Sequence, residues 1–337
     1  MKNPARRLNV ISSPPPASVT ITVPARLHLG FLDLNGGLGR RFGSVGLAIS
    51  GLHTRLTIAR AAKPHAEGAD SARALRYLES VQNRLGVADA HHVKVNEAVP
   101  AHAGLGSGTQ LALAVAWGVR ALHGLSPDTH ADAALLERGA RSGIGIGVFD
   151  GGGLVVDGGR GEHTDVPPII SRVMFPEHWR VIVMLDPTRQ GVHGADEIDA
   201  FSRLPPMPSP DAAHLCRLVL MKALPAAVED DLAGFGSAIT ELQQRVGDYF
   251  APTQGGQRFS SPDVAAVLRH LATQGAVGIG QSSWGPTGFA FAESESKANQ
   301  LFALARQHPN GRGLDIRICA GLNRGAELHR DQKHAQE

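Results

Sequence analysis

A glycine-rich segment near residue 106 holds the residues that most directly suggest chemistry. The string PAHAGLGSGTQLALA (100–114) places Gly104, Gly106 and Gly108 around Ser107, and an apolar face with helical spacing follows. The first N–H groups of a helix have no partner within the helix, and the helix dipole adds positive charge at that end. A glycine-rich loop that opens into a helix can therefore bind phosphate, although the pattern also suits a helix that only needs a flexible start.

The loop differs from the two commonest phosphate-binding motifs. No GKS or GKT follows it, and it is not a GxGxxG after the strand of a βαβ unit. The sequence also shows no recognisable Ser/His/Asp or Cys/His arrangement for an activated nucleophile.

Two aspartates lie beside glycines downstream, in GIGIGVFDGGGLVVDGG. We expect Asp150 at the turn into an apolar strand and Asp157 at its exit. Aspartate next to glycine commonly caps the backbone of a turn. Asp150 could instead bind a metal ion or stabilise a cation, and both alternatives stay open.

The composition excludes several classes of protein. At about 150 residues per domain, 337 residues predict roughly two domains. With 42% hydrophobic and 19% charged residues, global disorder and a coiled coil are excluded. The balance of 33 basic and 31 acidic residues argues against nucleic acid or a membrane as partner. Two cysteines, Cys216 and Cys319, are too few for a disulfide framework, which favours a reducing cytoplasm.

The elements that position these residues mix strands and helices without a strict βα alternation, which favours an α+β fold. Strands are expected over 18–34 with a corner at Pro24, over 45–49, 54–60, 91–97, 179–185, 313–320 and on both sides of a turn within 275–294; helices are expected over 70–86, 231–250, 261–275 and 296–308 and from residues 109, 127 and 211. The expected organisation is a mobile lead-in (1–17), two domains (18–166 and 167–325) and a polar tail (326–337).

Three segments in this order resemble the GHMP kinase superfamily, named from its galactose, homoserine, mevalonate and phosphomevalonate kinases. They are PARLHLGFLDLNG from residue 24, PAHAGLGSGTQLALA at 100–114 and GIGQSSWGPTGFAF at 278–291. The resemblance implies a two-domain α+β fold. Its N-terminal domain would resemble domain 2 of ribosomal protein S5, its C-terminal domain would be ferredoxin-like, and a phosphate-binding loop would lie between them.

One departure from the kinases changes the implied activity. The kinases generally carry GLGSS, whereas this chain has GLGSGTQ, with Gly108 in place of the second serine. Longer strings, including HLGFLDLNGGLGR, FGSVGLAIS and QGVHGADEIDAF, resemble one branch of the superfamily, the β-ribofuranosylaminobenzene 5′-phosphate synthases of methanopterin biosynthesis. Members of that branch join 5-phosphoribosyl 1-pyrophosphate to 4-aminobenzoate, release CO₂ and pyrophosphate, and require Mg²⁺.

The resemblance implies a site that holds a polyanionic sugar donor with N–H groups, cations and Mg²⁺. The implied catalytic residues are Asp150, Arg26 and His28. The implied substrate- and phosphate-binding residues are Gly104, Leu105, Gly106, Ser107, Gly108, Thr109, Gln110, Arg40, Arg189, His193, Ser282 and Ser283. The carboxylates considered for Mg²⁺ are Asp150, Asp33, Asp196 and Glu197. Each cationic residue taken alone could equally be a solvated surface charge.

Two other functions stay open from the sequence. One is an ATP-dependent small-molecule kinase on the same fold, which needs a purine pocket that the sequence does not identify. The other is a binding protein that kept the fold and lost the chemistry. The expected partners are the two small-molecule substrates and a second copy of the chain in a homodimer, and the aromatic acceptor could be 4-aminobenzoate or a close analogue.

Overall fold

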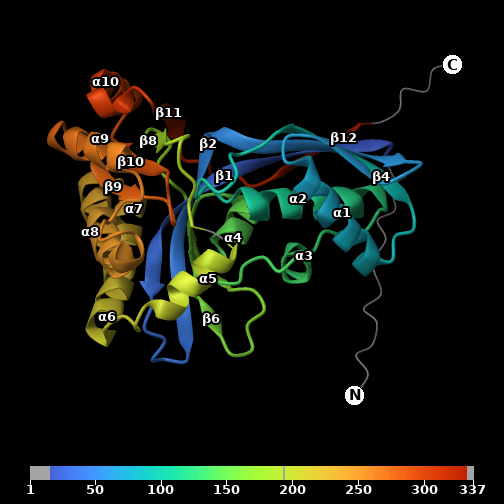
Figure 1. Ribbon diagram of the computed structural model, residues 1–337, viewed down its shortest axis with the longest axis horizontal. Helices are drawn as coiled ribbons and strands as arrows, with labels where there is room; N and C mark the ends of the chain where they lie inside the picture. Colours follow the sequence, from blue (N-terminus) through green and yellow to red (C-terminus); the bar gives the residue numbers. More distant parts are fainter. Residues whose placement is uncertain (1–15, 193, 332–337) are drawn as a thin grey trace.

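Two sheets, each packed against helices, lie side by side along the long axis of the molecule (Figure 1). The computed structural model describes residues 16–192 and 194–331, without the side chains of 195, 196 and 198. Most of the expected lead-in (1–17) and residues 332–337 of the expected tail lie outside the described residues. In the described part, no helix combines the length and apolar character needed to cross a membrane.

The larger sheet is built on two long antiparallel strands, β1 (Ser18–Asp33) and β2 (Arg40–Ala61). The corner expected at Pro24 is a bulge within one continuous strand, because Pro24 faces His53 whereas Ala25 faces Ile49. The path of the sheet is β12-β1-β2-β4-β3, and β5 joins β2 to β7 beside it. The remaining strands of this half are β3 (His65–Gly68), β4 (Ala90–Glu97), β5 (Leu154–Asp157), β6 (Arg160–Gly161), β7 (Ile169–Val173) and β12 (Glu327–Asp331).

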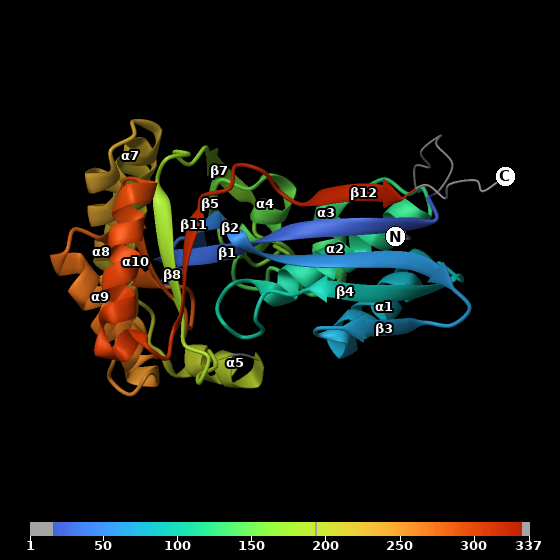
Figure 2. The ribbon, with the colours of Figure 1, turned by 90° about the horizontal axis from the view of Figure 1, so that it is seen from above.

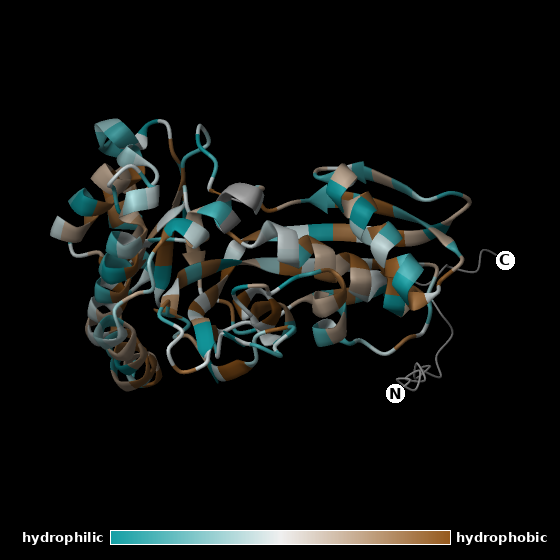
Figure 3. Ribbon diagram, turned by 60° about the horizontal axis from the view of Figure 1, so that its bottom comes forward, coloured by the Kyte–Doolittle hydropathy of each residue, from teal (hydrophilic) through white to brown (hydrophobic). Residues whose placement is uncertain are grey.

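Four helices belong to this half: α1 (Ser71–Leu85), α2 (Ser107–Leu122), α3 (Thr129–Leu135) and α4 (Ile144–Gly151). The periodicity of α2 correctly predicted its buried face, which packs on β1 and β2. Gly118 lies where the approach is tightest, since a Cβ there would be 2.5 Å from Cδ1 of Ile58. Apolar residues, brown in Figure 3, alternate with polar ones along the long strands and the outer helices.

Residues 144–151 form the helix α4, which the sequence analysis did not predict. The glycines let this helix pack closely, because a Cβ on Gly147 would be 2.7 Å from Cδ1 of Ile169. The apolar strand expected between Asp150 and Asp157 is β5 (Leu154–Asp157). Only Leu154–Asp157 is extended, so Asp150 lies in the last turn of α4.

The second sheet has the order β11-β8-β10-β9, with all neighbours antiparallel. Its strands are β8 (Arg180–Leu185), β9 (Val277–Gln281), β10 (Gly288–Ala292) and β11 (Asp315–Ala320). Helices connect β8 to β9 and β10 to β11, so this is the ferredoxin-like βαββαβ arrangement that was expected. The helices here are α5 (Gly194–Arg203), α6 (Ser209–Leu218), the π-helix η1 (Val219–Ala223), α7 (Leu224–Val228), α8 (Leu232–Phe250), η2 (Ala251–Thr253), α9 (Pro262–Thr273), α10 (Glu295–Gln307) and η3 (Pro309–Gly311).

The two faces of the second sheet bury different partners. Ile182 and Met184 pack with α9 and α10 in one core cluster. Val181 and Val183 belong to a cluster that contains residues of α8, of the C-terminal half of β1 and of the segment 45–52 of β2. This second cluster makes the two halves continuous at the level of β1 (Figure 2).

The chain passes from the N-terminal to the C-terminal domain later than expected. Its last described segment then returns to the N-terminal domain. β7 pairs with β5, so the N-terminal domain continues to Val173. Residues 327–331, predicted as part of a polar tail, form β12 and pair with residues 18–22 of β1. The mostly exposed side chains of this segment did not predict a strand. The segment is held by backbone hydrogen bonds to β1 at the edge of the sheet.

A buried ion pair in the N-terminal domain gives a test of its packing. Arg120 on α2 donates to both carboxylate oxygens of Asp132 at 2.7–2.9 Å, and the side chains are 6% and 4% exposed. Arg120→Met leaves a buried carboxylate unpaired, so the free energy of unfolding should fall by about 3–5 kcal/mol. Arg317→Met, which breaks an exposed pair with Asp315, should cost at most about 1 kcal/mol. Equal losses in urea denaturation would contradict the burial described here.

Candidate active site

A cavity of about 510 Å³ lies where the two halves meet at the glycine-rich loop. The N-terminal half contributes the start of α2, residues Arg26 and His28 of β1, Arg73 of α1 and the segment 137–142. The C-terminal half contributes Glu197 of α5 and the β9–β10 loop. A ligand in this cavity would therefore contact both domains.

The glycine-rich loop ends at a helix N-terminus, as predicted. Gly106 is the N-cap of α2, with φ of 85°, and the helix begins at Ser107. Gly106 has no side chain to cap the first N–H groups, and the first turn contains no acidic residue. The positive end of α2 is thus presented to the cavity, which suits an anion.

The loop is fixed in place by contacts to both domains. The Ser282 hydroxyl accepts the N–H of His28 at 2.9 Å and donates to the Gly104 carbonyl at 2.7 Å. The same carbonyl accepts Nη1 of Arg26 at 2.6 Å. Ser282 is fully buried and does not line the cavity, whereas its neighbour Ser283 does. Ser282 is therefore a positioning residue in this arrangement.

Guanidinium groups gather at the start of α2. A Cβ built on Gly108 would be 3.5 Å from Nη1 of Arg73 and 3.7 Å from Nη1 of Arg138. Arg73 is held by the Asp70 carboxylate and donates to Oγ of Ser107 at 3.3 Å. The sequence analysis missed Arg73, Arg138 and Arg141, because they lie outside the recognised motifs and only the fold brings them to the loop.

Arg26 is a partly buried cation on the cavity wall, and its Nε is screened from solvent. Burial lowers the pKa of Arg26 to about 10, against the opposing effect of Glu197. Its Nε has no hydrogen-bond partner among the described residues. A buried charge with an unused donor is costly unless an anion accompanies it, which supports the predicted place of Arg26 in a site for anionic ligands.

Glu197 is the predicted metal-binding carboxylate whose side chain lines the cavity. It forms an ion pair with Arg141. Burial raises the pKa of Glu197 above its usual range, while Arg141 acts in the opposite direction. Glu137 also lines the cavity. Carboxylate and hydroxyl oxygens suit Mg²⁺, but this set fits an ion bound chiefly through ligand phosphates and not one enclosed by protein carboxylates.

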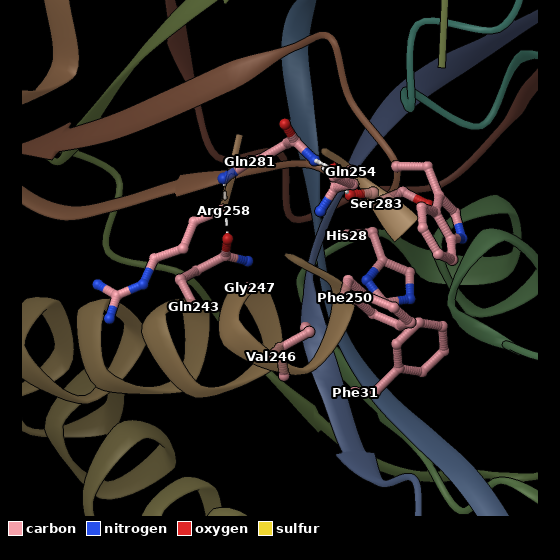
Figure 4. Close-up of a pocket in the computed structure, with 12 residues that line it drawn as sticks. His28, Phe31, Gln243, Val246, Gly247, Phe250, Gln254, Arg258, Gln281 and Ser283 are labelled. Atoms are coloured by element: carbon pink, nitrogen blue, oxygen red, sulfur yellow. Dashed lines mark hydrogen bonds between the residues drawn. The ribbon is translucent and has the colours of Figure 1, made fainter. Parts of the chain in front are cut away.

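His28 is buried beside the cavity, and its ring centroid is 4.5 Å from that of Phe31. Burial, assisted by the charge of Arg26, lowers the pKa of His28 to about 3, so the imidazole is neutral at ordinary pH. Its Nε2 has no hydrogen-bond partner among the described residues. Figure 4 shows His28 next to Phe31 and Phe250 in a small adjoining pocket. The site thus offers a neutral polar atom among aromatic rings.

Four of the predicted residues are used elsewhere in the fold. Arg40 donates to the carbonyls of Gly158 and Gly159 at 2.8 Å, so it fixes a turn. Contrary to the expectation, it does not line the cavity. Asp33 accepts two N–H groups of the turn that follows it. Arg189 donates to the Ser260 carbonyl. Asp150 is exposed in the last turn of α4, near Arg172, outside the cavity lining.

The other predicted residues fall into three groups: some line the cavity, some lie in the core, and some lie outside the described residues or side chains. Gly104, Gly106, Ser107, Gly108 and Thr109 line the cavity. Leu105 is a core residue, and Gln110 is buried with its Nε2 donated to the Gly145 carbonyl. His193 lies outside the described residues, and Asp196 is described only as backbone within α5.

Comparisons with known proteins first define the class. The model described as "GHMP kinases N terminal domain" matches residues 72–152, and "GHMP kinases C terminal" matches residues 222–309. Homoserine kinase from Cytophaga hutchinsonii has a TM-score of 0.66 at 13% identity and covers 95% of this chain and 100% of its own. Mevalonate diphosphate decarboxylase from Staphylococcus aureus has a TM-score of 0.62 at 16% identity, covering 93% and 98%. The fold is that of the GHMP kinases.

The sequence relatives narrow this class to one family. Beta-ribofuranosylphenol 5′-phosphate synthase from Methanothermobacter thermautotrophicus is 33% identical over 328 residues, which cover 91% of this chain and 97% of the relative. The protein of that name from Archaeoglobus fulgidus is 32% identical, covering 91% and 98%. This chain therefore belongs to the beta-ribofuranosylphenol 5′-phosphate synthase family of the GHMP kinase superfamily.

The helix N-terminus predicts a difference between two glycines of similar backbone conformation. Gly106→Ala and Gly86→Ala both force a side chain into positive φ, so each should cost about 1–2 kcal/mol of stability. Only at Gly106 would the Cβ meet Arg26, at 3.0 Å, beside the anion site; nothing lies within 4 Å at Gly86. Calorimetric titration with pyrophosphate should show at least about tenfold weaker binding for Gly106→Ala alone. Unchanged affinity would make the loop a structural turn.

Proposed function

We propose that the protein is a decarboxylating pentosyltransferase, which joins 5-phosphoribosyl 1-pyrophosphate to a 4-substituted benzoate with release of pyrophosphate and CO₂. Family membership supports the reaction. The structural observation that supports it is the convergence of arginines and the uncapped start of α2 on one cavity between the domains. A donor with a 5′-phosphate and a pyrophosphate needs this concentration of positive charge.

The donor is proposed to lie with its pyrophosphate at the start of α2. The N–H groups of Ser107 and Gly108 and the guanidinium groups of Arg73 and Arg138 would hold the leaving group. Their charge is fixed before the reaction, so it stabilises the pyrophosphate as the C1–oxygen bond breaks. Arg26, on the cavity wall beside the loop, would add to the same field.

The site would hold Mg²⁺ together with the donor, and the ion would supply charge that neutralises the departing pyrophosphate. The hydroxyls of Ser107 and Thr109 and the carboxylate of Glu137 lie on the cavity wall and are the protein oxygens proposed to complete its coordination. Glu197 then takes the role that the sequence suggested for Asp150. Its carboxylate would face the positive charge that develops on the ribose.

The acceptor ring is proposed to attack through the carbon that bears its carboxylate. That carbon forms the new bond to C1 of the ribose, the bond to the carboxylate breaks, and its electron pair restores the aromatic ring as CO₂ leaves. No protein nucleophile is required. The unpartnered Nε2 of His28 is proposed to accept a hydrogen bond from the 4-substituent. The relatives are named for a ribosylated phenol, which favours 4-hydroxybenzoate over 4-aminobenzoate.

The setting of the enzyme is part of the proposal. The cytoplasm is supported by the two cysteines, which are both free thiols. A homodimer is supported by exposed apolar residues on and near α7 and β7, among them Ile170, Met174, Leu220 and Met221.

A direct assay tests the proposed reaction. With the ribosyl donor, Mg²⁺ and 4-hydroxybenzoate, the protein should release pyrophosphate and CO₂ in a one-to-one ratio, and 4-aminobenzoate in a parallel reaction tests the alternative acceptor. Phosphorylation of a small molecule from ATP, with no CO₂, would favour a kinase instead. Binding of the donor without turnover with either acceptor would favour a binding protein.

Arg73, which the sequence analysis missed, and Arg40, which it assigned to phosphate binding, allow a matched test of donor binding. Arg73→Gln should weaken binding of 5-phosphoribosyl 1-pyrophosphate about tenfold to a hundredfold, because it removes a charge-assisted contact of about 1.5–3 kcal/mol. Arg40→Gln removes the bonds to Gly158 and Gly159, so it should lower the melting temperature and leave donor affinity unchanged. The reverse pattern would exclude the proposed pyrophosphate position.

A further inference from the structure

Two histidines and a glutamate share one face at the edge of the larger sheet. The short edge strand β3 pairs in parallel with β4, in a register that sets His65 opposite His92 and Glu67 opposite Lys94. Alternation along a strand places His65 and Glu67 on the same face. The ligand atoms of His65, Glu67 and His92 all lie within 4.8 Å of one another. None of the three lines the cavity of the candidate active site.

His92 shows that this cluster has unused binding capacity. Its Nε2 is screened from solvent and has no hydrogen-bond partner among the described residues. Oε1 of Glu67 is 3.7 Å away. The His65 and His92 rings are stacked, with centroids 5.3 Å apart and planes inclined by 18°. A buried imidazole nitrogen therefore faces a carboxylate with a second imidazole alongside.

We propose that His65, Glu67 and His92 bind one divalent transition-metal ion of the Zn²⁺ type, with water as the fourth ligand. Two imidazoles and one carboxylate suit Zn²⁺ and Co²⁺, whereas Mg²⁺ and Ca²⁺ prefer oxygen ligands alone. Ligand atoms about 2.0–2.1 Å from zinc lie roughly 3.3 Å apart in a tetrahedron, so the cluster must contract slightly. Rotation of the exposed His65 side chain and of Glu67 can supply this.

Without a bound metal, the ammonium group of Lys94 lies beside the Glu67 carboxylate. Its Nζ is 3.5 Å from Oε1 of Glu67. An incoming cation must displace this ammonium group and bind next to its charge, which lowers metal affinity. The site is therefore assigned a modest affinity that removal of the Lys94 charge should increase.

The bound ion would fasten the edge of the sheet. β3 has four residues and is the last strand in the sheet order, next to β4 (Figure 2). A metal ligated from both strands would cross-link them in addition to their backbone hydrogen bonds. Because the ligands are assembled only in the folded chain, binding should stabilise the protein.

The experiment uses untagged, metal-free full-length protein titrated with Zn²⁺ by calorimetry and with Co²⁺ by visible absorption. We expect one ion per chain, a tetrahedral Co²⁺ spectrum, and a melting temperature that rises with Zn²⁺. His92→Ala and His65→Ala should each weaken binding at least about tenfold and abolish the thermal shift. Lys94→Met should bind more tightly than the native chain.

A matched control is needed because the chain has 16 histidines. His53 forms a pair with Glu97 on the same sheet, at 3.1 Å, but the pair is not part of a three-ligand cluster among the described residues. His53→Ala should leave the affinity and the Co²⁺ spectrum unchanged. The proposal is overturned if the native chain binds no Zn²⁺, if His92→Ala and His65→Ala bind as tightly as the native chain, or if His53→Ala alone abolishes binding.

Discussion

The carbonyl oxygen of Gly104 is the shared acceptor on which the geometry of the candidate active site depends. It receives the guanidinium of Arg26 from β1 and the hydroxyl of Ser282 from the C-terminal domain. Glycine is required there, because φ is positive and a Cβ would lie 2.2 Å from the Ser282 carbonyl oxygen. With this acceptor satisfied from two domains, the loop is held rigidly enough to leave the start of α2 open to a ligand.

The electrostatics of the cavity follow from this arrangement and not from the overall charge. The chain carries a net charge of only +2, yet the cavity wall holds Arg26, Arg73, Arg138 and Arg141 against Glu137 and Glu197. Arg141 is paired with Glu197 and Arg73 with Asp70, which leaves Arg26 and Arg138 as the positive excess near the start of α2. Burial of Arg26 lowers its pKa to about 10 and still leaves it charged at neutral pH. The local excess is what a polyanionic donor needs.

Much of the fold could be predicted from the sequence, but the site only in part. The periodicity of α2 and α8 and the Ser261 cap of α9 are local signals, and the structure contains all three. The loop residues carried a motif, so their position was predictable. Arg73 and Arg138 carried none, since they reach the loop only through the packing of α1 and of the segment after α3.

The expectations that the structure does not match also concern contacts that form only in the folded chain. Arg40 lies in a recognisable string, but its guanidinium satisfies two backbone carbonyls that no sequence pattern announces. Asp150 was expected at the turn into an apolar strand, and β5 does follow it; what the sequence did not indicate is the helix α4 over 144–151, whose glycines permit close packing. Residues 327–331 look like a tail because a strand held by its backbone at a sheet edge needs no apolar face.

The fold alone does not require the glycine that separates this loop from the kinase pattern. Gly108 has an ordinary backbone conformation, and a Cβ there would meet Arg73, Arg138 and Tyr77 only at 3.5–3.8 Å, which are normal contacts. A serine could be accommodated, so packing does not demand glycine. A side chain at this position would stand between the two guanidinium groups and the first N–H groups of α2, where the proposed pyrophosphate lies. In the proposed arrangement, glycine keeps that space open and the pyrophosphate is bound by Arg73 and Arg138.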